Sequence, residues 1–408
     1  MQFDLIVVGG GAAGFFGAIQ AVHQKPDLKT IILEKSTKVL SKVRISGGGR
    51  CNVTHHDFNP FTLARHYPRG EKALKKLFKV YHAEHVVQWF ESRGVPLKSE
   101  NDGRIFPTTN SSQTVIDCFI NEVHRLGIRI ETAKDVSGID QALGGFNVRI
   151  SDGQIYQAKK ILIATGGNPK RSAYDWIAHL NHAVKEPIPS LFTFNDAHKK
   201  FKDLMGVSVP HAEVRIQGTK LLQRGPVLLT HWGLSGPAVI KLSAWAAEYL
   251  HAVNYKFKIL VDWTGGLGEE QVRLRLVEYK SLRSRQKILS DSLFSLPQRL
   301  SQRLCELAEV DISKTWSELT QKKINKLVEL LIRCPFDIQG KTTFKEEFVT
   351  CGGVELEEIN LTTMESKRVK NIYIAGEVLN IDGETGGFNF QSAWTTAYIA
   401  ATAIASCH

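Results

Sequence analysis

The stretch FDLIVVGGGAAGFFGAIQAV, residues 3–22, decides the fold. It opens with an apolar run that is typical of a buried parallel strand, and its glycines follow the spacing G-x-G-x-x-G at Gly9, Gly11 and Gly14. In such a turn Gly9 permits the tight reversal of the chain, Gly11 lets the backbone approach a pyrophosphate, and Gly14 lets the next helix pack closely on the strand. The stretch therefore predicts a dinucleotide-binding strand-turn-helix.

The second predicted strand supports this interpretation. KTIILEK, residues 29–35, is mostly apolar and reaches Glu34, which lies 20 residues after Gly14. An acid at that distance matches the residue that hydrogen-bonds a ribose hydroxyl in dinucleotide sites. Because an acid disfavours a 2′-phosphate, we expect FAD or NAD rather than NADP. The alternative is a glycine turn that precedes an ordinary surface glutamate.

Two later segments favour a flavin. AKKILIATGG, residues 158–167, predicts an apolar strand with a Thr-Gly-Gly turn, and VKNIYIAGEVLNIDGETGGFNF, residues 369–390, predicts a strand, an acidic glycine loop and the start of a helix. The arrangement is similar to the two-part FAD fold of the glutathione-reductase superfamily, in which the first and last segments of the chain meet. The sequence has no second G-x-G-x-x-G with its own strand and no C-x-x-C pair, so neither a nicotinamide domain nor a redox disulfide is expected. NAD(P)H would then bind transiently over the flavin.

A third glycine-rich stretch, SGGGRCNV at residues 46–53, begins 12 residues after Glu34. We expect its glycines to let the backbone approach the cofactor, with Arg50 and Asn52 as polar contacts; a surface salt bridge is the alternative for Arg50. Asp382 is expected to hold the ribityl chain, and the turn at residues 386–389 to bring N–H groups to the flavin ring at a helix start. The full set of predicted FAD contacts is Gly9, Gly11, Ala12, Ala13, Gly14, Glu34, Lys35, Gly47, Gly48, Gly49, Arg50, Asn52, Val136, Ala164, Thr165, Gly166, Gly376, Glu377, Asp382, Gly386, Gly387, Phe388 and Asn389.

The composition limits the kinds of protein to which the chain can belong. With 408 residues, 43% hydrophobic and 23% charged, the chain is an ordinary globular sequence that is long enough for two or three domains. Its six scattered cysteines form no pair, which favours a reduced, cytoplasmic protein without disulfides, and no metal-ligand pattern is present. No run of 18 apolar residues predicts a transmembrane helix, and the start of the chain reads as a strand rather than a signal peptide.

The net charge of +11 is concentrated in part in residues 61–81, where six cations face only Glu71. Cations steer proteins to phosphate backbones, so the excess indicates either a polyanionic partner or simple solubility. The helical spacing separates an apolar stripe from a lysine stripe. The segment therefore predicts either an RNA-backbone clamp or the solvated face of an amphipathic helix. The cations are Arg65, Arg69, Lys72, Lys75, Lys76 and Lys79, and the apolar stripe is Leu74, Leu77, Phe78 and Tyr81.

The predicted fold class is α/β, with three parts. A Rossmann-like FAD-binding domain is assigned to residues 1–190 plus 340–408. Alternating strand patterns predict an inserted β-rich domain at 191–262, and apolar residues at helical spacing predict a helical subdomain at 263–339. Insertions of this kind usually cover a substrate site.

Five stretches together resemble the YhiN/BaiN-like flavoproteins: SGGGRCNVT (46–54), GRIFPTTNSSQTV (103–115), THWGLSGPAVIKLSA (230–244), TCGGVELEEINLTTMESK (350–367) and IAGEVLNIDGETGGFNFQSAW (374–394). The resemblance implies an FAD domain with a β and a helical insertion, and bound FAD. It also implies reduction of an activated alkene. One branch is similar to steroid-ring reductases, and the other to a ribosomal RNA dihydrouridine synthase that reduces uridine. The basic charge favours RNA.

Reduction of a C=C bond needs a proton donor. Cys51 follows Arg50, whose charge is expected to lower the pKa of the thiol. Cys351 lies in a Gly-rich turn before the last FAD segment, and His231 lies in the motif THWGLSGP. The alternatives are apolar packing for either cysteine and a structural role for the histidine. Two further functions stay open: reduction or dehydrogenation of a small molecule, and a non-catalytic flavin- or RNA-binding module.

Overall fold

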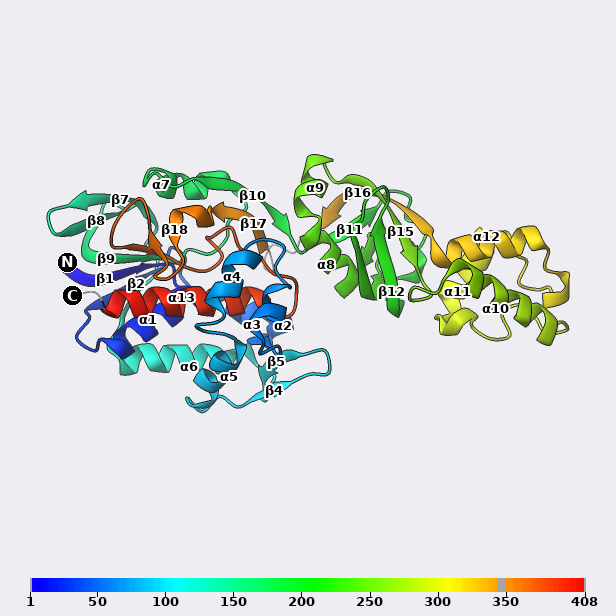
Figure 1. Ribbon diagram of the computed structural model, residues 1–408, viewed down its shortest axis with the longest axis horizontal. Coiled ribbons are helices and arrows are strands. Elements are labelled where there is room, and N and C mark those ends of the chain that lie inside the picture. Colours follow the sequence, from blue (N-terminus) through cyan, green and yellow to red (C-terminus); the bar gives the residue numbers. More distant parts are fainter. Residues whose placement is uncertain (1, 343–348, 407–408) are drawn as a thin grey trace. The chain divides into compact units, whose positions relative to one another are not determined.

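The computed structural model describes residues 2–342 and 349–406. The chain forms two compact units (Figure 1): unit 1 comprises residues 1–190 and 345–408, and unit 2 comprises residues 191–344. Unit 1 is therefore discontinuous in sequence, because the whole of unit 2 is inserted between its strands. The predicted division into three parts stays a prediction.

A parallel sheet forms the centre of unit 1. Its strands follow the order β20 (Ile372–Ile374), β9 (Ile155–Ile163), β1 (Gln2–Val8), β2 (Thr30–Leu33) and β6 (Arg129–Glu131). All four neighbouring pairs are parallel, and β1, β9 and β2 end in register at Val8, Ile163 and Leu33. The turns after these strands therefore meet at one edge. This topology confirms the Rossmann-like domain that the first stretch predicted.

Antiparallel strands extend this sheet and form two smaller sheets. In the main sheet β7 (Val136–Ala142) and β8 (Gly145–Ile150) lead into β9. At the other edge β19 (Glu365–Ser366) pairs with β20, and β18 (Ile359–Asn360) pairs with β19. The smaller sheets pair β10 (Val184–Ser190) with β17 (Val349–Val354), and β5 (Arg104–Pro107) with β3 (Thr54–His55) and β4 (Leu97–Ser99).

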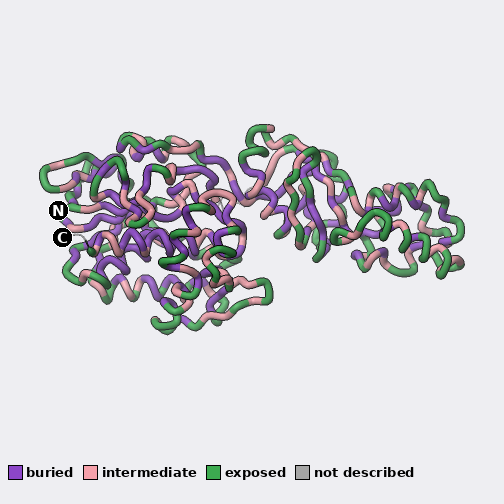
Figure 2. The backbone as a smooth tube through the Cα atoms, in the orientation of Figure 1, coloured by how far each residue is buried: buried purple, intermediate pink, exposed green. Residues whose placement is uncertain are grey.

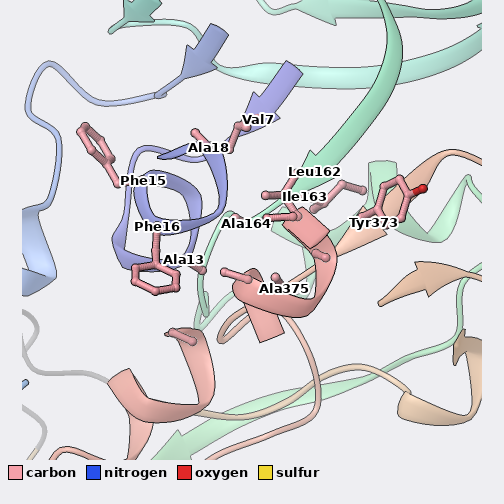
Figure 3. Close-up of a cluster of buried hydrophobic side chains, with 14 of the residues drawn as sticks. Val7, Ala13, Phe15, Phe16, Ala18, Leu162, Ile163, Ala164, Tyr373 and Ala375 are labelled. Carbon is pink, nitrogen blue, oxygen red and sulfur yellow. The ribbon is translucent and has the colours of Figure 1, made fainter. Parts of the chain in front are cut away.

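The first and last helices of unit 1 pack side by side against the sheet (Figure 1). They are α1 (Ala12–Gln24) and α13 (Phe388–Ser406). Small residues allow this approach, since a Cβ on Gly17 of α1 would lie only 3.6 Å from the Cβ of Ala397 of α13. Ala13, Ala164 and Ala375 belong to the same hydrophobic core (Figure 3). The other helices are α2 (Ser41–Gly49), α3 (Pro60–Ala64), α4 (Glu71–Leu77), α5 (Ala83–Glu91), α6 (Ser112–Arg125) and α7 (Asp175–Ala178).

Unit 2 is a closed six-stranded barrel with helices. The barrel order is β11 (Thr193–Asp196), β14 (Gly233–Ser235), β13 (Leu222–Leu229), β12 (Ser208–Ile216), β15 (Lys256–Asp262) and β16 (Cys334–Thr342). The helices are α8 (Pro237–Trp245), α9 (Ala247–Ala252), α10 (Glu269–Leu282), α11 (Gln298–Leu307) and α12 (Gln321–Ile332). Barrel and helices share one hydrophobic core, to which Val261, Leu304 and Leu327 contribute.

Burial follows the sequence patterns (Figure 2). β2 is buried at every residue, as expected of a central parallel strand, whereas β12 alternates buried and exposed residues over part of its length. Within the part of the chain that the structure describes, no helix has the length and apolar character needed to cross a membrane.

Candidate cofactor and substrate site

The dinucleotide turn joins β1 to α1, and close packing dictates two of its glycines. Gly9 has φ +113°, and a Cβ there would lie 2.3 Å from the carbonyl oxygen of Ala164. A Cβ on Gly14 would lie 1.9 Å from the carbonyl oxygen of Gly9. Both positions therefore admit only glycine, as the sequence predicted for a tight reversal and a close helix–strand contact.

Gly11 faces open space instead. No atom lies within 4 Å of the position that a Cβ on Gly11 would take. The N–H groups of Ala12, Ala13 and Gly14 donate to no acceptor among the described residues, and no side chain caps α1. These N–H groups stand at the positive end of the helix dipole, where anions are stabilised. The turn can therefore accept a diphosphate.

A cavity of about 440 Å³ opens beside this turn. Glu34 lies in its wall, with one carboxylate oxygen accepting from the Gly10 N–H at 2.8 Å and the other from the Ser36 N–H at 2.8 Å. The cavity suits the adenosine half of a dinucleotide because it adjoins the open turn. Of the predicted contacts it brings together Gly9, Glu34, Lys35, Val136, Thr165 and Gly166.

The sequence reasoning missed other residues of this cavity. Tyr174, Trp176 and His179 line it from the segment after β9. The Tyr174 hydroxyl accepts from the Asn168 N–H at 2.9 Å, and burial raises the pKa of that hydroxyl to about 12. The sequence signal that could have identified these residues is the aromatic side chains that follow the strand end Ala-Thr-Gly-Gly. Ala164 itself is buried behind the turn.

The glycines of SGGGRCNV are required by their dihedral angles. Gly47, Gly48 and Gly49 have φ values of +58°, +69° and +83°. No atom lies within 4 Å of a Cβ on Gly48 or Gly49, so one side of the turn is open. Three consecutive residues in the left-handed region strongly favour glycine. The turn can therefore bring its backbone close to a ligand.

Arg50 is engaged with its own surroundings. Its guanidinium group lies 2.6 Å from a Glu100 carboxylate oxygen and stacks 4.0 Å from the centre of the Phe106 ring. The salt bridge that was the alternative for Arg50 is thus present. A pyrophosphate contact by Arg50 stays a prediction.

Cys51 is fully buried, and burial raises the pKa of its thiol to about 12. The expectation that Arg50 lowers this pKa is wrong, because the charge of Arg50 is paired with Glu100 and loss of water around the sulfur dominates. At neutral pH the thiol is protonated. Its role as a proton donor stays a prediction.

Asn52 connects the middle of unit 1 to its C-terminal loop. In the amide orientation that satisfies every contact, Oδ1 accepts from the Gly387 N–H at 2.9 Å and Nδ2 donates to the carbonyl oxygens of Thr54 and Ile105. A Cβ on Gly387 would lie 2.6 Å from the Thr54 carbonyl oxygen. Two predicted motifs, 335 residues apart at Asn52 and Gly387, therefore meet in one structure.

The C-terminal loop is closed by its own side chains. The Asn389 amide donates to the Gly383 carbonyl oxygen at 3.0 Å and accepts from the Gly383 N–H at 2.8 Å. Asn389 thus shapes the loop that precedes α13. A Cβ on Gly376 would lie 2.7 Å from the Cβ of Ala13, so this strand end also adjoins the dinucleotide turn.

Glu377 and Asp382 make internal contacts. Glu377 accepts from Lys42 Nζ at 2.6 Å and from the Thr350 N–H at 3.0 Å. Asp382 is fully buried and binds Arg69 through both carboxylate oxygens, one of which also accepts from the Ser190 hydroxyl at 2.7 Å. A carboxylate held in this way joins segments of the unit. A ribityl contact by Asp382 stays a prediction.

A histidine cluster beside this loop was missed. The His66 ring stacks on Phe388, with centres 4.2 Å apart, and His66 Nδ1 lies 3.3 Å from a Glu384 carboxylate oxygen. His55 Nδ1 lies 3.1 Å from the Gly386 carbonyl oxygen, and burial lowers the pKa of His55. Because a carbonyl oxygen only accepts, Nδ1 of His55 carries the proton. The cluster could hold or move protons next to the Gly386–Gly387 turn.

The other two predicted proton donors belong to other elements of the chain. Cys351 is buried in β17 of unit 1, where it pairs with Ile188 of β10. His231 is an exposed residue of unit 2 and packs edge-on against Trp232, with ring centres 4.4 Å apart. Among residues 2–342 and 349–406, no three His, Cys, Asp or Glu side chains are arranged to hold a metal ion.

Comparisons with known proteins agree with this architecture. Residues 3–403 match the family described as HI0933-like protein Rossmann domain. The chain is 26% identical over 410 residues to a 3-dehydro-bile acid delta(4,6)-reductase from Clostridium scindens, covering 98% of each. It is 27% identical over 412 residues to a ribosomal RNA dihydrouridine synthase from Escherichia coli, covering 98% of this chain and 97% of that protein.

Among solved structures, a 3-ketosteroid-delta4-(5alpha)-dehydrogenase from Rhodococcus jostii shares the fold. Its TM-score is 0.53 at 13% sequence identity, with 100% of this chain and 97% of that chain covered. Together these matches confirm the family resemblance and the Rossmann FAD-binding fold that the sequence motifs predicted.

Proposed function

The chain belongs to the HI0933-like family, and from that premise we propose that it uses FAD and NAD(P)H to reduce uridine to dihydrouridine in large-subunit ribosomal RNA. The observation that carries the proposal is the convergence in unit 1 of an open Gly11 turn, the adjoining cavity and the Asn52–Gly387 junction. These three features lie on segments from both ends of the chain. Each fits a different part of a flavin dinucleotide.

The residues have distinct proposed roles. The N–H groups of Ala12, Ala13 and Gly14 hold the diphosphate, and Glu34 holds the ribose. The turns at residues 47–49 and 386–387 enclose the flavin end. When bound, FAD supplies two-electron hydride chemistry.

The chain must also supply a proton for the second carbon of the reduced bond. A donor works best when its pKa is near the working pH. Burial raises the pKa of Cys51 to about 12, which is far from that condition. By position, the second candidate is His66, which lies beside the Glu384 carboxylate and stacks on Phe388. Cys51→Ala tests this assignment, since retained FAD with lost turnover supports Cys51. If Cys51→Ala retains both FAD and turnover, the proton donor is instead Cys351, His231 or His66 of the His66–Glu384 pair.

An RNA substrate is supported by the net charge of +11 and by the family relative that modifies ribosomal RNA. Because ribosomal RNA is cytoplasmic, we propose the same location for the enzyme. The test is to delete the gene and map dihydrouridine along ribosomal RNA. At least one site should disappear and return with the plasmid-borne gene but not with Gly11→Ala. Persistence of every site would reject the proposal.

A small-molecule alkene reductase is the second candidate. It is favoured by the bile-acid reductase, which is 26% identical to this chain over 98% of its length. The purified protein separates the candidates: NAD(P)H consumption stimulated by steroid enones and not by RNA supports the small molecule. A third candidate, a flavin-binding module without turnover, predicts no stimulated NAD(P)H consumption by either.

A further inference from the structure

The six cations of residues 61–81 fall into two groups. Arg69 is bound to buried Asp382, and Lys75 Nζ lies 2.6 Å from a Glu71 carboxylate oxygen. These two charges are neutralised within the protein. The other four are exposed and form no ion pair with a described residue: Arg65, Lys72, Lys76 and Lys79.

The unpaired lysines share one surface. Lys72, Lys76 and Lys79 are spaced at i, i+4 and i+7, which places them on one face of α4 and the turn that follows it. The opposite stripe, Leu74, Leu77 and Phe78, is buried in the core. The core therefore fixes the direction of the lysine face.

An exposed aromatic ring lies within this basic surface. Phe61, in α3, is 51% exposed, and Lys79 Nζ lies 5.2 Å from the centre of its ring. Arg65 follows one helical turn later on the same side of the chain. A large exposed ring flanked by cations combines two elements used to bind unpaired nucleic acid, namely base stacking and phosphate contact.

We propose that Phe61, Arg65, Lys72, Lys76 and Lys79, termed the Phe61 surface, bind an unpaired segment of RNA. The cations contact phosphates, and the ring of Phe61 stacks on a base. The inference deepens the proposed function and rests on it for the identity of the RNA. Binding of an unpaired segment is favoured over binding of a duplex, because the ring of Phe61 can stack only on a base that is not already stacked in a helix.

The Phe61 surface also adjoins the cofactor loop. Arg69, between Arg65 and Lys72, holds Asp382, and a Cβ on Gly70 would lie 2.8 Å from the side chain of Ile381. RNA on this surface would thus be anchored on the same rigid part of unit 1 as the loop of residues 381–387. Anchoring there positions a neighbouring nucleotide near the flavin end of the site.

The test measures binding of a fluorescent, unstructured RNA oligonucleotide to the FAD-loaded protein across a range of salt concentrations. Replacing Lys72, Lys76 and Lys79 together by Gln should weaken binding roughly 100-fold at 0.1 M salt and reduce the salt slope by about 2, at about 0.7 per phosphate contact. Lys75→Gln is the matched control, because Lys75 lies on the same helix but is paired with Glu71. It should change neither quantity appreciably.

Phe61→Ala separates stacking from charge. It should weaken binding about tenfold, the effect of losing one base–aromatic stack, and leave the salt slope unchanged. Unchanged affinity in both the triple variant and Phe61→Ala would overturn the inference. So would equal loss in Lys75→Gln, or binding of anionic phospholipid vesicles in preference to RNA.

The result of this RNA-binding test is independent of the result of the gene-deletion test of the proposed function. If gene deletion leaves every dihydrouridine in place while the triple variant loses RNA binding, the Phe61 surface stands and the reaction is wrong. If deletion removes a dihydrouridine and the variants bind RNA normally, the reaction stands and the Phe61 surface is wrong.

Discussion

The two glycine turns of unit 1 require glycine for different reasons. In the dinucleotide turn a Cβ on Gly9 or Gly14 would collide with backbone oxygen at 2.3 or 1.9 Å. In the SGGGRCNV turn a Cβ on Gly48 would meet nothing within 4 Å, but φ is +69°. Gly14 of the first turn is limited by space, and Gly48 of the second turn is limited by backbone conformation. Glycine spacing alone does not distinguish these cases.

The difference predicts which changes affect folding and which affect the ligand. Where the chain packs on itself, an added methyl group must displace backbone. Where the chain faces open space, the same methyl group costs only conformational strain or obstructs a bound molecule. Gly11 combines an open side with an extended backbone, φ −96° and ψ −167°, so it isolates the effect on the ligand.

The largest effect is expected from Gly14→Ala. The methyl group would overlap the carbonyl oxygen of Gly9, so we expect a loss of at least about 3 kcal/mol in the free energy of unfolding, measured by urea denaturation. Gly17→Ala is the matched control in the same helix, since its methyl group meets mainly the end of the Leu162 side chain. Equal stability of the two variants would contradict the distinction.

Gly11→Ala should leave folding intact and weaken FAD binding by at least about tenfold. The methyl group would project into the open side of the turn, where we propose that the diphosphate of FAD binds. The measurement is titration of apoprotein with FAD by quenching of flavin fluorescence, alongside urea denaturation without FAD. A variant with normal FAD affinity would show that the open side of Gly11 is not the diphosphate site.

Gly48→Ala and Gly48→Asn test the second turn. Alanine in a left-handed conformation should lower the free energy of unfolding by about 1–2 kcal/mol, and asparagine by less, because asparagine tolerates this conformation better. Thermal unfolding without FAD measures both. If asparagine were as destabilising as alanine, an unrecognised steric contact rather than backbone strain would limit this turn.

Arg50→Gln should have the smallest effect, about 1 kcal/mol or less. It removes a partly exposed ion pair with Glu100 and a cation–π contact with Phe106 that hold the second turn from outside. Because the ion pair is screened by salt, the difference from the unchanged protein should shrink as salt is added. A large loss that is independent of salt would instead indicate a packing role for Arg50.

Much of the site could be predicted from sequence because its chemistry is local. The roles of Gly9, Gly11 and Gly14 follow from spacing within a single turn. Their placement beside Glu34 and Thr165 follows from a general rule, since parallel strands end at one edge of a sheet. The meeting of Gly9, Glu34 and Thr165 at the cavity beside this turn needed no long-range information beyond strand order.

The partners of the charged residues could not be predicted in this way. Arg50–Glu100, Arg69–Asp382 and His66–Glu384 join residues 50, 313 and 318 positions apart. The sequence offered a salt bridge as one alternative for Arg50 but could not identify Glu100 as its partner, nor predict the raised pKa of Cys51. The division of the basic segment into paired and unpaired cations likewise depends on Asp382 from the other end of the chain.

The sequence by itself determined the α/β fold class, the order of strands that builds the dinucleotide turn, and the glycines that the turn requires. These features follow from residue type and short spacing, because backbone conformation and helix–strand packing are set within a few residues. Tertiary structure alone decided which charges are paired, that the Cys51 thiol is buried, and which histidines adjoin the Gly386–Gly387 turn. Those properties depend on contacts between segments that are far apart in the chain, and burial and pairing exist only once those segments have packed.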